Sequence, residues 1–355
     1  MAQAAAASQD AFGAMPIVSD LDAFREAYEA FGRVGRLVAQ PMNHTPLVRW
    51  NDLNVIGVSP KFDGIGVSLV VTPRGAWFFH RSSGDAKSAS HAAMRCRAVP
   101  LRWEGPLPLV LTGELVLTKA TSRLCFFAFD VMCLGEDRLA PREGCPVSHG
   151  VDPADAWNQR GELVARCCAK LASPNVDILP KPWLPAKDAM ECANDPALHT
   201  QAMPWRDVPR DGTLAAVNLV KGGVAVLKIK EPRDHTIDVE LMEESGRQFA
   251  APIDMNGVRV VRFSVTPNPT LRGPGVYECR VNHVIGAAVV AADKTTGPLP
   301  DCTLAADKAT VVIEPILRRN KKANHPNVVL STCGSSMNPE SHDQTLASLV
   351  KECAM

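Results

Sequence analysis

Short runs of β-branched, aliphatic and aromatic residues recur through most of this chain, and they limit its fold more than any other feature. Such runs are typical of strands. Helical spacing is confined to Leu21–Leu37, which Asp20 is placed to cap, and to Gly161–Leu171. The sequence therefore predicts an α+β fold. The strand-like runs are Val67–Thr72, Ala76–His80, Leu109–Leu117, Leu124–Cys133, Ala215–Val220, Gly223–Lys230, Val258–Val265, Gly275–Val281, Ala287–Ala292 and Thr310–Leu317.

The length of 355 residues favours two domains, and the strand-like runs after Val258 favour a small second one. The segment Ala140–Trp157, rich in Pro, Gly and charge, predicts a surface excursion. We predict four parts along the chain, namely a flexible N-terminal tail over 1–20, a large α+β domain over 21–240, a β-rich domain over 241–332 and a polar C-terminal tail over 333–355.

Charge and cysteine usage narrow the function classes and the compartment. Lys+Arg and Asp+Glu are both 38, so the formal net charge is zero. The chain as a whole therefore lacks the positive charge that attracts duplex nucleic acid. The 11 cysteines are irregularly spaced without a CxxC pair, which indicates buried, reduced thiols in the nucleus or cytoplasm. The Ala-rich start lacks a basic region, and no apolar run approaches the roughly 20 residues that span a bilayer. We expect no membrane partner.

Lys61 opens the tetrapeptide Lys61–Gly64, just before an apolar run. A lysine at such a turn can face a pocket and act as a nucleophile, provided that it loses its proton. Burial and nearby cations lower the pKa of a lysine and favour that loss. A solvated lysine at a tight turn is the alternative that this motif alone leaves open.

Three further segments carry groups that need a ligand or a partner. Glu114 interrupts an apolar strand, where a carboxylate is costly unless it is paired or bound to a metal. Asp211 opens another strand-like run. Lys228 and Lys230 alternate onto one strand face, where two like charges favour an anion such as a triphosphate between them. These two lysines are also expected to depress the pKa of Lys61.

Taken in chain order, these segments resemble the motifs of the covalent nucleotidyltransferase superfamily, which holds mRNA capping guanylyltransferases and ATP-dependent DNA and RNA ligases. The resemblance covers about residues 40–330 and implies a ligase-type, ATP-grasp-like nucleotidyltransferase domain of antiparallel sheets and helices, followed by an OB-fold barrel with Gly275–Arg280 as an early OB strand. The matching segments are Lys61–Gly64, Phe78–Arg81, Thr112–Val116, Phe126–Val131, Leu179–Trp183, Asp211–Ala216, Leu227–Pro232, His235–Asp238, Arg319–Lys322 and Pro326–Asn327.

The resemblance implies a role for each matched residue. Lys61 would be the nucleophile, Phe129 would stack on the base, and Lys181 would read the guanine oxygen. The implied cofactor is Mg²⁺ or Mn²⁺, with GTP as substrate. The other implied catalytic residues are Lys228, Lys230, Arg319 and Lys322, the other nucleotide contacts are Asp63, Gly64, Arg81, Glu114, Lys228, Lys230 and Asp238, and the metal ligands are Asp211 and Glu114.

Capping is the activity that the resemblance favours, because Asp211 and the Thr236–Asp238 segment match capping enzymes more closely than ligases. The chain would transfer GMP from GTP, through a lysyl-GMP intermediate, to the 5′-diphosphate end of RNA. An RNA triphosphatase and a cap methyltransferase would then be separate chains. Two alternatives stay open: an ATP-dependent DNA or RNA ligase with a lysyl-AMP intermediate, and a catalytically inactive scaffold that binds nucleotide or RNA.

Three positions depart from the superfamily pattern. Gly66 stands where an arginine is usual, Thr112 replaces an aspartate, and Lys321 replaces another aspartate. Such divergence is typical of fast-evolving viral enzymes, for which the compartment would be an infected host cell or a virion. These departures also support the alternative of a catalytically inactive scaffold.

Overall fold

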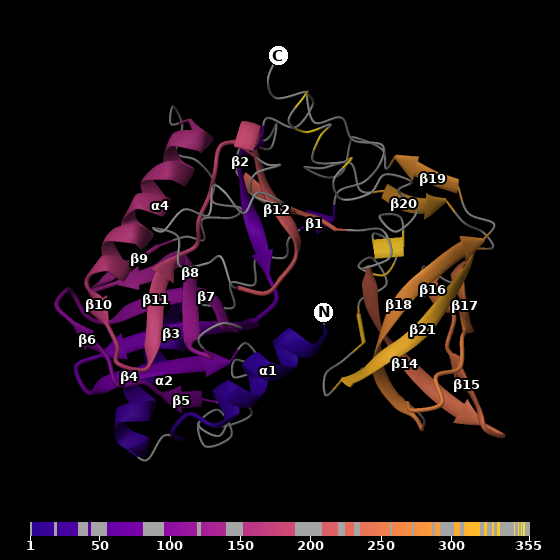
Figure 1. Cartoon of the computed structure of the whole chain (residues 1–355), viewed down its shortest axis with the longest axis horizontal. Helices are drawn as coiled ribbons and strands as arrows, with labels where there is room; N and C mark the ends of the chain where they lie inside the picture. The colour runs from indigo at the N-terminus through magenta and orange to yellow at the C-terminus, as the bar shows by residue number, and fades with distance from the viewer. Residues whose placement is uncertain are drawn as a thin grey trace.

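The computed structural model describes most of the chain, with gaps (Figure 1). The described residues are 2–17, 20–34, 42–43, 55–80, 96–118, 122–139, 152–188, 208–218, 224–230, 235–255, 258–271, 273–285, 288–291, 302–305, 309–319, 323–324 and the single positions 329, 332, 333, 344, 347, 349 and 351.

A seven-stranded sheet forms the centre of the larger body, in the order β11-β8-β7-β3-β4-β5 with β9 paired to β8. Three α-helices accompany it. The strands are β3 (Ile65–Thr72), β4 (Gly75–His80), β5 (Cys96–Ala98), β7 (Leu109–Leu117), β8 (Leu124–Leu134), β9 (Asp137–Arg138) and β11 (Val176–Pro180), and the helices are α1 (Ala2–Gly13), α2 (Leu21–Val34) and α4 (Pro153–Ala169).

Both faces of this sheet are buried, which explains why its strands read as nearly continuous apolar runs rather than alternating ones. Leu69 faces a cluster that includes Phe12 of α1 and Val164 of α4. Its neighbour Val70 faces the opposite cluster, which includes Phe24 of α2. Successive strand residues point to opposite faces, so helices on both sides bury most positions of the central strands, while Gly66 on β3 and Glu114 on β7 stay partly exposed.

A four-stranded sheet in the order β1-β13-β12-β2 adjoins the first. β12 lies antiparallel to both of its neighbours. A bridge from Val58 to Leu184, just before the short 3-10 helix η3 (Ala186–Asp188), covers the outer edge of β2. The strands are β1 (Met42–Asn43), β2 (Val55–Phe62), β12 (Arg210–Asn218) and β13 (Val224–Ile229), and a separate pair is formed by β6 (Arg102–Trp103) and β10 (Leu171–Ala172).

The last part of the chain forms a six-stranded sheet in the order β15-β14-β18-β21-β17-β16. β15 and β16 are separated by only two residues, Ala251 and Pro252, so they act as two halves of one bent strand that closes the sheet into a barrel. The strands are β14 (Thr236–Glu244), β15 (Arg247–Ala250), β16 (Ile253–Met255), β17 (Val258–Val265), β18 (Gly275–Ile285) and β21 (Ala309–Arg319), with a hairpin of β19 (Ala288–Ala291) and β20 (Cys302–Ala305) beside them.

This barrel has the five-stranded Greek-key connectivity of an OB fold once β15 and β16 count as one strand. β17 and β21 pair in parallel, while the other neighbours pair antiparallel. The predicted fold class, an α+β domain of antiparallel sheets and helices followed by an OB-fold barrel, is thereby confirmed. Gly275–Arg280 was expected to be an early OB strand, and this is wrong, because β18 is the fourth of the five.

Two predicted boundaries differ from the structure. Residues 1–20 were expected to form a flexible tail, yet α1 packs on the sheet, with Phe12 buried and the Leu117 amide donating to Ser8 Oγ at 3.0 Å. The boundary at 240 falls inside β14, whose first residue Thr236 already pairs with β18, so the barrel begins by Thr236. The division into two domains otherwise stays a prediction.

The expected surface excursion Ala140–Trp157 overlaps the start of α4. Asp152 caps this helix by accepting the Ala154 amide, and Pro153 occupies its first turn. Trp157 is buried within it. Residues 140–151 lie outside the described part of the chain. The predicted C-terminal tail also differs in one respect, because Cys333 is buried in the hydrophobic cluster of the barrel.

Candidate active site

Side chains from three neighbouring strands meet at the carboxylate of Asp211. Lys61 Nζ donates to Asp211 Oδ1 at 2.5 Å, and Lys230 Nζ donates to Oδ2 at 2.6 Å. The side chains of Lys61, Asp211 and Lys230 are only 19%, 13% and 16% exposed, so the three charges interact with little screening. Two ammonium groups thus share one anion, and any ligand that replaces Asp211 between them must itself be negative.

A β-bulge aims Asp211 at the two lysines. The register of β12 on β2 moves from Arg210 opposite Phe62 to Thr213 opposite Pro60, so Asp211 and Gly212 together face the single residue Lys61. Two residues facing one is the defining feature of a bulge, which turns a side chain away from its regular alternation.

Gly212 makes this bulge possible, and its replacement by alanine should be destabilising. Its φ is +139°, which side-chain-bearing residues rarely adopt, and a Cβ there would lie 2.4 Å from the Ile229 carbonyl oxygen. We expect Gly212→Ala to lower the free energy of unfolding by about 2–4 kcal/mol, through backbone strain and overlap together. Urea unfolding would measure the change.

Gly246 provides the matched control, because its φ is also positive, at +76°, while nothing lies within 4 Å of the Cβ it would gain. Gly246→Ala should therefore show only the strain component, about 1 kcal/mol. Equal losses in the two variants would mean that the close approach to Ile229 is unimportant.

The turn after Lys61 is held against β7. The Asp63 amide donates to the Pro209 carbonyl oxygen at 2.8 Å, and the Gly64 amide donates to Glu114 Oε1 at 3.3 Å. A Cβ on Gly64 would lie 2.6 Å from the Leu115 carbonyl oxygen, so only glycine fits this approach. Gly66, which stands where an arginine is usual in the superfamily, lies opposite Glu114 in the β3–β7 register.

The pKa of Lys61 is raised above its ordinary value, which contradicts the expectation that neighbouring cations would lower it. Burial lowers the pKa, but the carboxylates of Asp211, Glu114 and Asp63 together raise it further. Lys230, the cation expected to act on Lys61, is instead neutralised by Asp211. Without a bound nucleotide, Lys61 is therefore an ammonium ion, and its activation requires that Asp211 be drawn away from it.

The pKa of Asp63 is raised to about 6 by burial and by the charge of Asp211, against the lowering effect of Lys61. Folding therefore favours the neutral acid relative to the unfolded chain, although the carboxylate still predominates above about pH 6. The contribution of Asp63 to the free energy of unfolding is therefore complete below the ordinary pKa of 3.8, and it is lost as the pH rises through about 6.

Asp63→Asn, which mimics the neutral acid, should consequently stabilise the fold at neutral pH. Because Asp63 is only half-buried, we discount for solvent screening and expect a gain of about 1 kcal/mol near pH 7.5. Urea unfolding at several pH values would measure it. The gain should vanish near pH 4, and a gain that does not depend on pH would contradict the assigned pKa.

A cluster of two aromatic rings and one cation lies beside β2, the strand that carries Lys61. Lys181 Nζ lies 4.3 Å from the ring centroid of Phe62 and 5.0 Å from that of Phe129. Phe129 is itself a bulged residue, because the β7–β8 register moves from Thr112 opposite Asp130 to Gly113 opposite Ala128. The structure thus brings Phe129 and Lys181 together, while their contacts with a base stay a prediction.

Arg319 and Asp238 lie together in the barrel instead of at Lys61. Arg319 Nη2 lies 2.7 Å from Glu278 Oε2, and its Nε lies 3.5 Å from Asp238 Oδ1. Asn324 closes this network by donating to Asp238 Oδ2 at 3.2 Å. Glu278 and Asn324 were not singled out from the sequence as site residues, although Glu278 lies within the matched segment Gly275–Arg280.

Lys228 lies on β13 opposite Leu214 and is half-buried. Its charge acts with that of Lys230 on His235, whose pKa falls to about 4, first because the imidazole is buried and then because of the two lysines. His235 is therefore neutral near pH 7. The predicted site residues Arg81 and Lys322 lie outside the described residues, as do Lys321, Pro326 and Asn327 of the same motif.

The carboxylates near Lys61 fit a divalent cation that is held jointly with a substrate. Asp211 and Glu114 both raise the pKa of Asp63, which places three acids within electrostatic reach of one another. Among the described residues, however, no three acidic, His or Cys side chains converge closely enough to hold an ion alone. Mg²⁺ is commonly bound by one or two carboxylates together with phosphate oxygens, and that is the arrangement these residues allow.

Comparisons with known proteins find only distant similarity to solved structures. No family model matches the chain, and no curated protein matches it significantly. It is similar to a mycobacterial DNA ligase D complexed with ATP and MES, with 13% identity, 81% of this chain and 97% of that chain covered, and a TM-score of 0.35. It is also similar to the ligase domain of LigD from M. tuberculosis, with 13% identity, 78% and 98% covered, and a TM-score of 0.28. Scores this low do not establish a shared fold, so the fold rests on the strand pairing above.

The described helices include none that is both long and apolar enough to cross a bilayer.

Proposed function

We propose that this chain is a covalent nucleotidyltransferase in which Lys61 becomes linked to a nucleoside monophosphate. One observation carries the proposal: the candidate nucleophile Lys61 shares the carboxylate of Asp211 with Lys230. The Nζ atoms of the two lysines lie 2.5 and 2.6 Å from the carboxylate oxygens. Two buried cations around one displaceable anion form a ready site for a triphosphate. Phe129 is the partly exposed ring of the cluster that it forms with Lys181 and the buried Phe62, and it supplies a surface for the base.

In the proposed reaction, phosphate oxygens replace Asp211 as the partner of Lys230. Lys61 must lose a proton before it attacks, because an ammonium has no lone pair. Asp63, with a pKa of about 6, is the nearby carboxylate best matched to accept that proton. Lys61 Nζ then forms a bond to the α-phosphorus as the bond to pyrophosphate breaks. A divalent cation, Mg²⁺ or Mn²⁺, bound by Asp211 and Glu114 would supply charge neutralisation for the phosphates.

The specific activity that we propose is mRNA guanylyltransfer, with GTP as the donor and the 5′-diphosphate end of RNA as the acceptor. It is supported by Asp211, where ligases tend to carry glutamate, and by the Thr236–Asp238 segment that follows Lys230. An RNA triphosphatase and a cap methyltransferase on other chains would complete the pathway. Buried free thiols such as Cys125 and Cys279 fit a reducing compartment, the nucleus or cytoplasm, or a host cell or virion for a viral enzyme.

An ATP-dependent DNA or RNA ligase is the second candidate, and one observation favours it. Lys181, which would read the guanine oxygen, lies over the rings of Phe62 and Phe129 in this structure. In that position its ammonium faces aromatic rings, and this contact gives no preference for guanine over adenine. An inactive scaffold is the third candidate, and it would bind nucleotide without forming an adduct.

Incubation with α-labelled GTP or ATP and Mg²⁺ or Mn²⁺, followed by denaturing electrophoresis, separates the three candidates. A labelled band with GTP that pyrophosphate discharges supports guanylyltransfer. A band with ATP alone moves the protein to the ligases. No band with either nucleotide contradicts the proposed covalent chemistry.

A further inference from the structure

Helix α4 holds the bulged segment of β8 through a buried ion pair. Arg160 Nε lies 2.6 Å from Asp130 Oδ1, and the two side chains are 15% and 8% exposed. The same carboxylate oxygen accepts the Val131 amide at 2.9 Å. Asp130 directly follows Phe129 in the chain, so the ion pair fixes the backbone on one side of that bulged residue.

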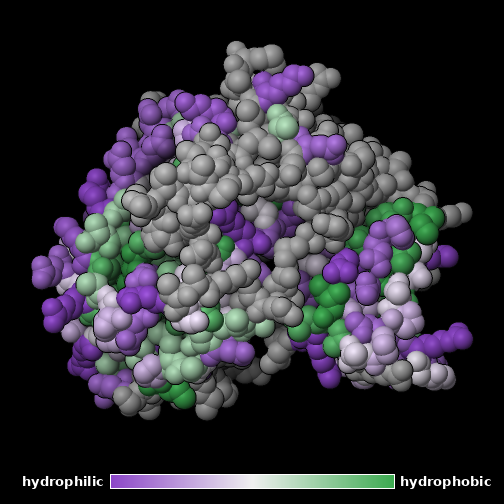
Figure 2. Space-filling model, in the orientation of Figure 1, coloured by the Kyte–Doolittle hydropathy of each residue, from purple (hydrophilic) through white to green (hydrophobic). Residues whose placement is uncertain are grey.

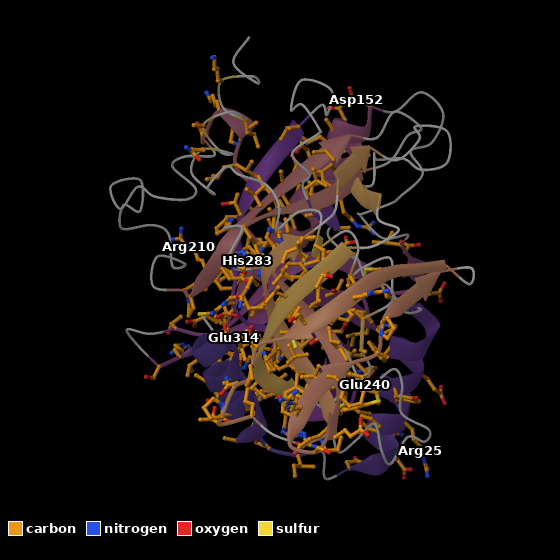
Figure 3. The ribbon with its side chains drawn as sticks, turned by 90° about the vertical axis from the view of Figure 1, so that its right-hand side faces the viewer. Arg25, Asp152, Arg210, Glu240, His283 and Glu314 are labelled. Atoms are coloured by element: carbon orange, nitrogen blue, oxygen red, sulfur yellow. The ribbon has the colours of Figure 1, made fainter. Side chains whose placement is uncertain are left out.

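The same helix also holds the segment that carries Lys181. Trp157, three residues before Arg160 on α4, meets Trp183 edge to face, with centroids 5.0 Å apart and planes at 84°. Trp183 is two residues beyond Lys181, whose amide donates to the Ala128 carbonyl oxygen at 2.8 Å, on the other side of the bulge. α4 lies along β8 and β11 in Figure 1, and Figure 3 labels its capping residue, Asp152.

Helix α4 therefore contacts both the β8 segment that carries Phe129 and the segment that carries Lys181. Lys61, Asp211 and Lys230 belong instead to the four-stranded sheet and the residue that follows it. Figure 2 shows hydrophilic residues near the middle of one face of the molecule. A change at α4 should consequently act on the base and leave the phosphates largely undisturbed.

Stability alone is a weak reason for a buried ion pair at this position. Replacing such a pair with apolar residues is often neutral or stabilising, because burying two charges costs desolvation free energy. A guanidinium offers a rigid, directional contact that an apolar side chain does not. The pair at Arg160 is thus better suited to fixing the direction of a neighbouring side chain than to holding the helix in place.

We propose that Arg160 is a positioning residue for nucleotide base recognition: through Asp130 it sets the direction of Phe129 and so the stacking surface for the base. The proposal rests on the proposed function, since it assigns the base to Phe129. It predicts that changes at Arg160 alter nucleotide affinity much more than the rate of the step at Lys61.

The test compares Arg160→Met with Arg160→Lys and with Arg166→Met. Arg166 is an exposed arginine one to two turns further along the same helix, so its replacement serves as the matched control. The nucleotide concentration for half-maximal adduct formation and the single-turnover rate at saturation are measured for each. We expect Arg160→Met to raise that concentration about tenfold or more, with the saturating rate changed less than about threefold. Arg160→Lys should fall between Arg160→Met and the wild type, and Arg166→Met should match the wild type.

Two results would overturn the proposal: an unchanged half-maximal concentration in Arg160→Met, or equal losses in affinity and saturating rate. If Arg160→Met fails to fold, the same split measured for Arg160→Lys decides. Calorimetric binding of GTP and ATP covers the case in which no adduct forms at all. A loss of binding in the Arg160 variants would then support positioning even though the covalent chemistry had failed, while a wild type that binds neither nucleotide would end both proposals.

Discussion

Lys61→Ala should abolish the covalent adduct with labelled nucleotide, by more than about 10³-fold relative to the wild type. Among the described residues, Lys61 and Lys230 are the lysines that donate to Asp211, and Lys230 is expected to bind the phosphates, which leaves Lys61 as the nucleophile. Lys61→Arg should be equally inactive, because a guanidinium keeps its proton at any accessible pH. Denaturing electrophoresis with α-labelled GTP and ATP is the measurement.

Stability and a second lysine provide the controls for this experiment. Asp211 keeps Lys230 as its partner when Lys61 is removed, so the thermal midpoint of Lys61→Ala should stay close to that of the wild type. Lys187→Ala, at an exposed position in η3, should retain the full adduct. A persistent adduct in Lys61→Ala would show that another residue is the nucleophile.

Asp211→Asn should have the second largest effect, on both stability and activity. It leaves two ammonium groups near each other without the carboxylate that they share, which costs about 3–5 kcal/mol in comparable buried pairs. The pKa of Asp211 is lowered by Lys61 and Lys230 in spite of its burial, so the carboxylate stabilises the wild type above its ordinary pKa of 3.8 and less as the pH falls below it. Adduct formation should fall by about 10²-fold or more, because the phosphates lose a metal ligand.

Pyrophosphate distinguishes a lost counterion from general damage to the fold. If the two lysines form an anion site, pyrophosphate should raise the thermal midpoint of Asp211→Asn more than that of the wild type, where Asp211 competes for them. Asp211→Glu serves as the charge-preserving comparison and should respond like the wild type. A variant that is as stable as the wild type, and indifferent to pyrophosphate, would mean that the shared contact contributes little.

The order of motifs in the sequence was sufficient to name the residues that meet at the site. Lys61, Asp211 and Lys230 are far apart in the chain, and the pairing of β2, β12 and β13 brings them to one point. What the sequence could not show was their mutual neutralisation. The pKa of Lys61 depends on which carboxylates face it, and that follows from packing rather than from spacing.

Bulges were the second feature beyond sequence reasoning. Asp211 and Phe129 both lie where two residues of one strand oppose one of its neighbour, and that mismatch appears only when the strands are paired. The start of the chain was misjudged for a related reason. Its Ala-rich composition suggested a tail, whereas Phe12 and Ser8, at helical spacing on α1, make the contacts that hold it on the sheet.

Arg319 shows where motif matching gave a role that packing redirects. Its partner Glu278 lies on β18, which pairs with its own strand β21, and its partner Asp238 lies on β14, which pairs with β18. Which anion a cation selects is decided by the nearest carboxylates in three dimensions. Contact of Arg319 with the phosphates stays a prediction, and it requires that these two pairs be broken.

The bent strand formed by β15 and β16 has a consequence for how the barrel meets other molecules. By pairing with β14 at one end and β17 at the other, it leaves the ring without the row of unsatisfied amides and carbonyls that invites a foreign strand. Among the described residues, this pairing disfavours extension of the sheet by a partner's backbone at the bent strand, which is a common route to aggregation. Recognition at the barrel must instead read its side chains, among them Glu240, His283 and Glu314, which Figure 3 labels.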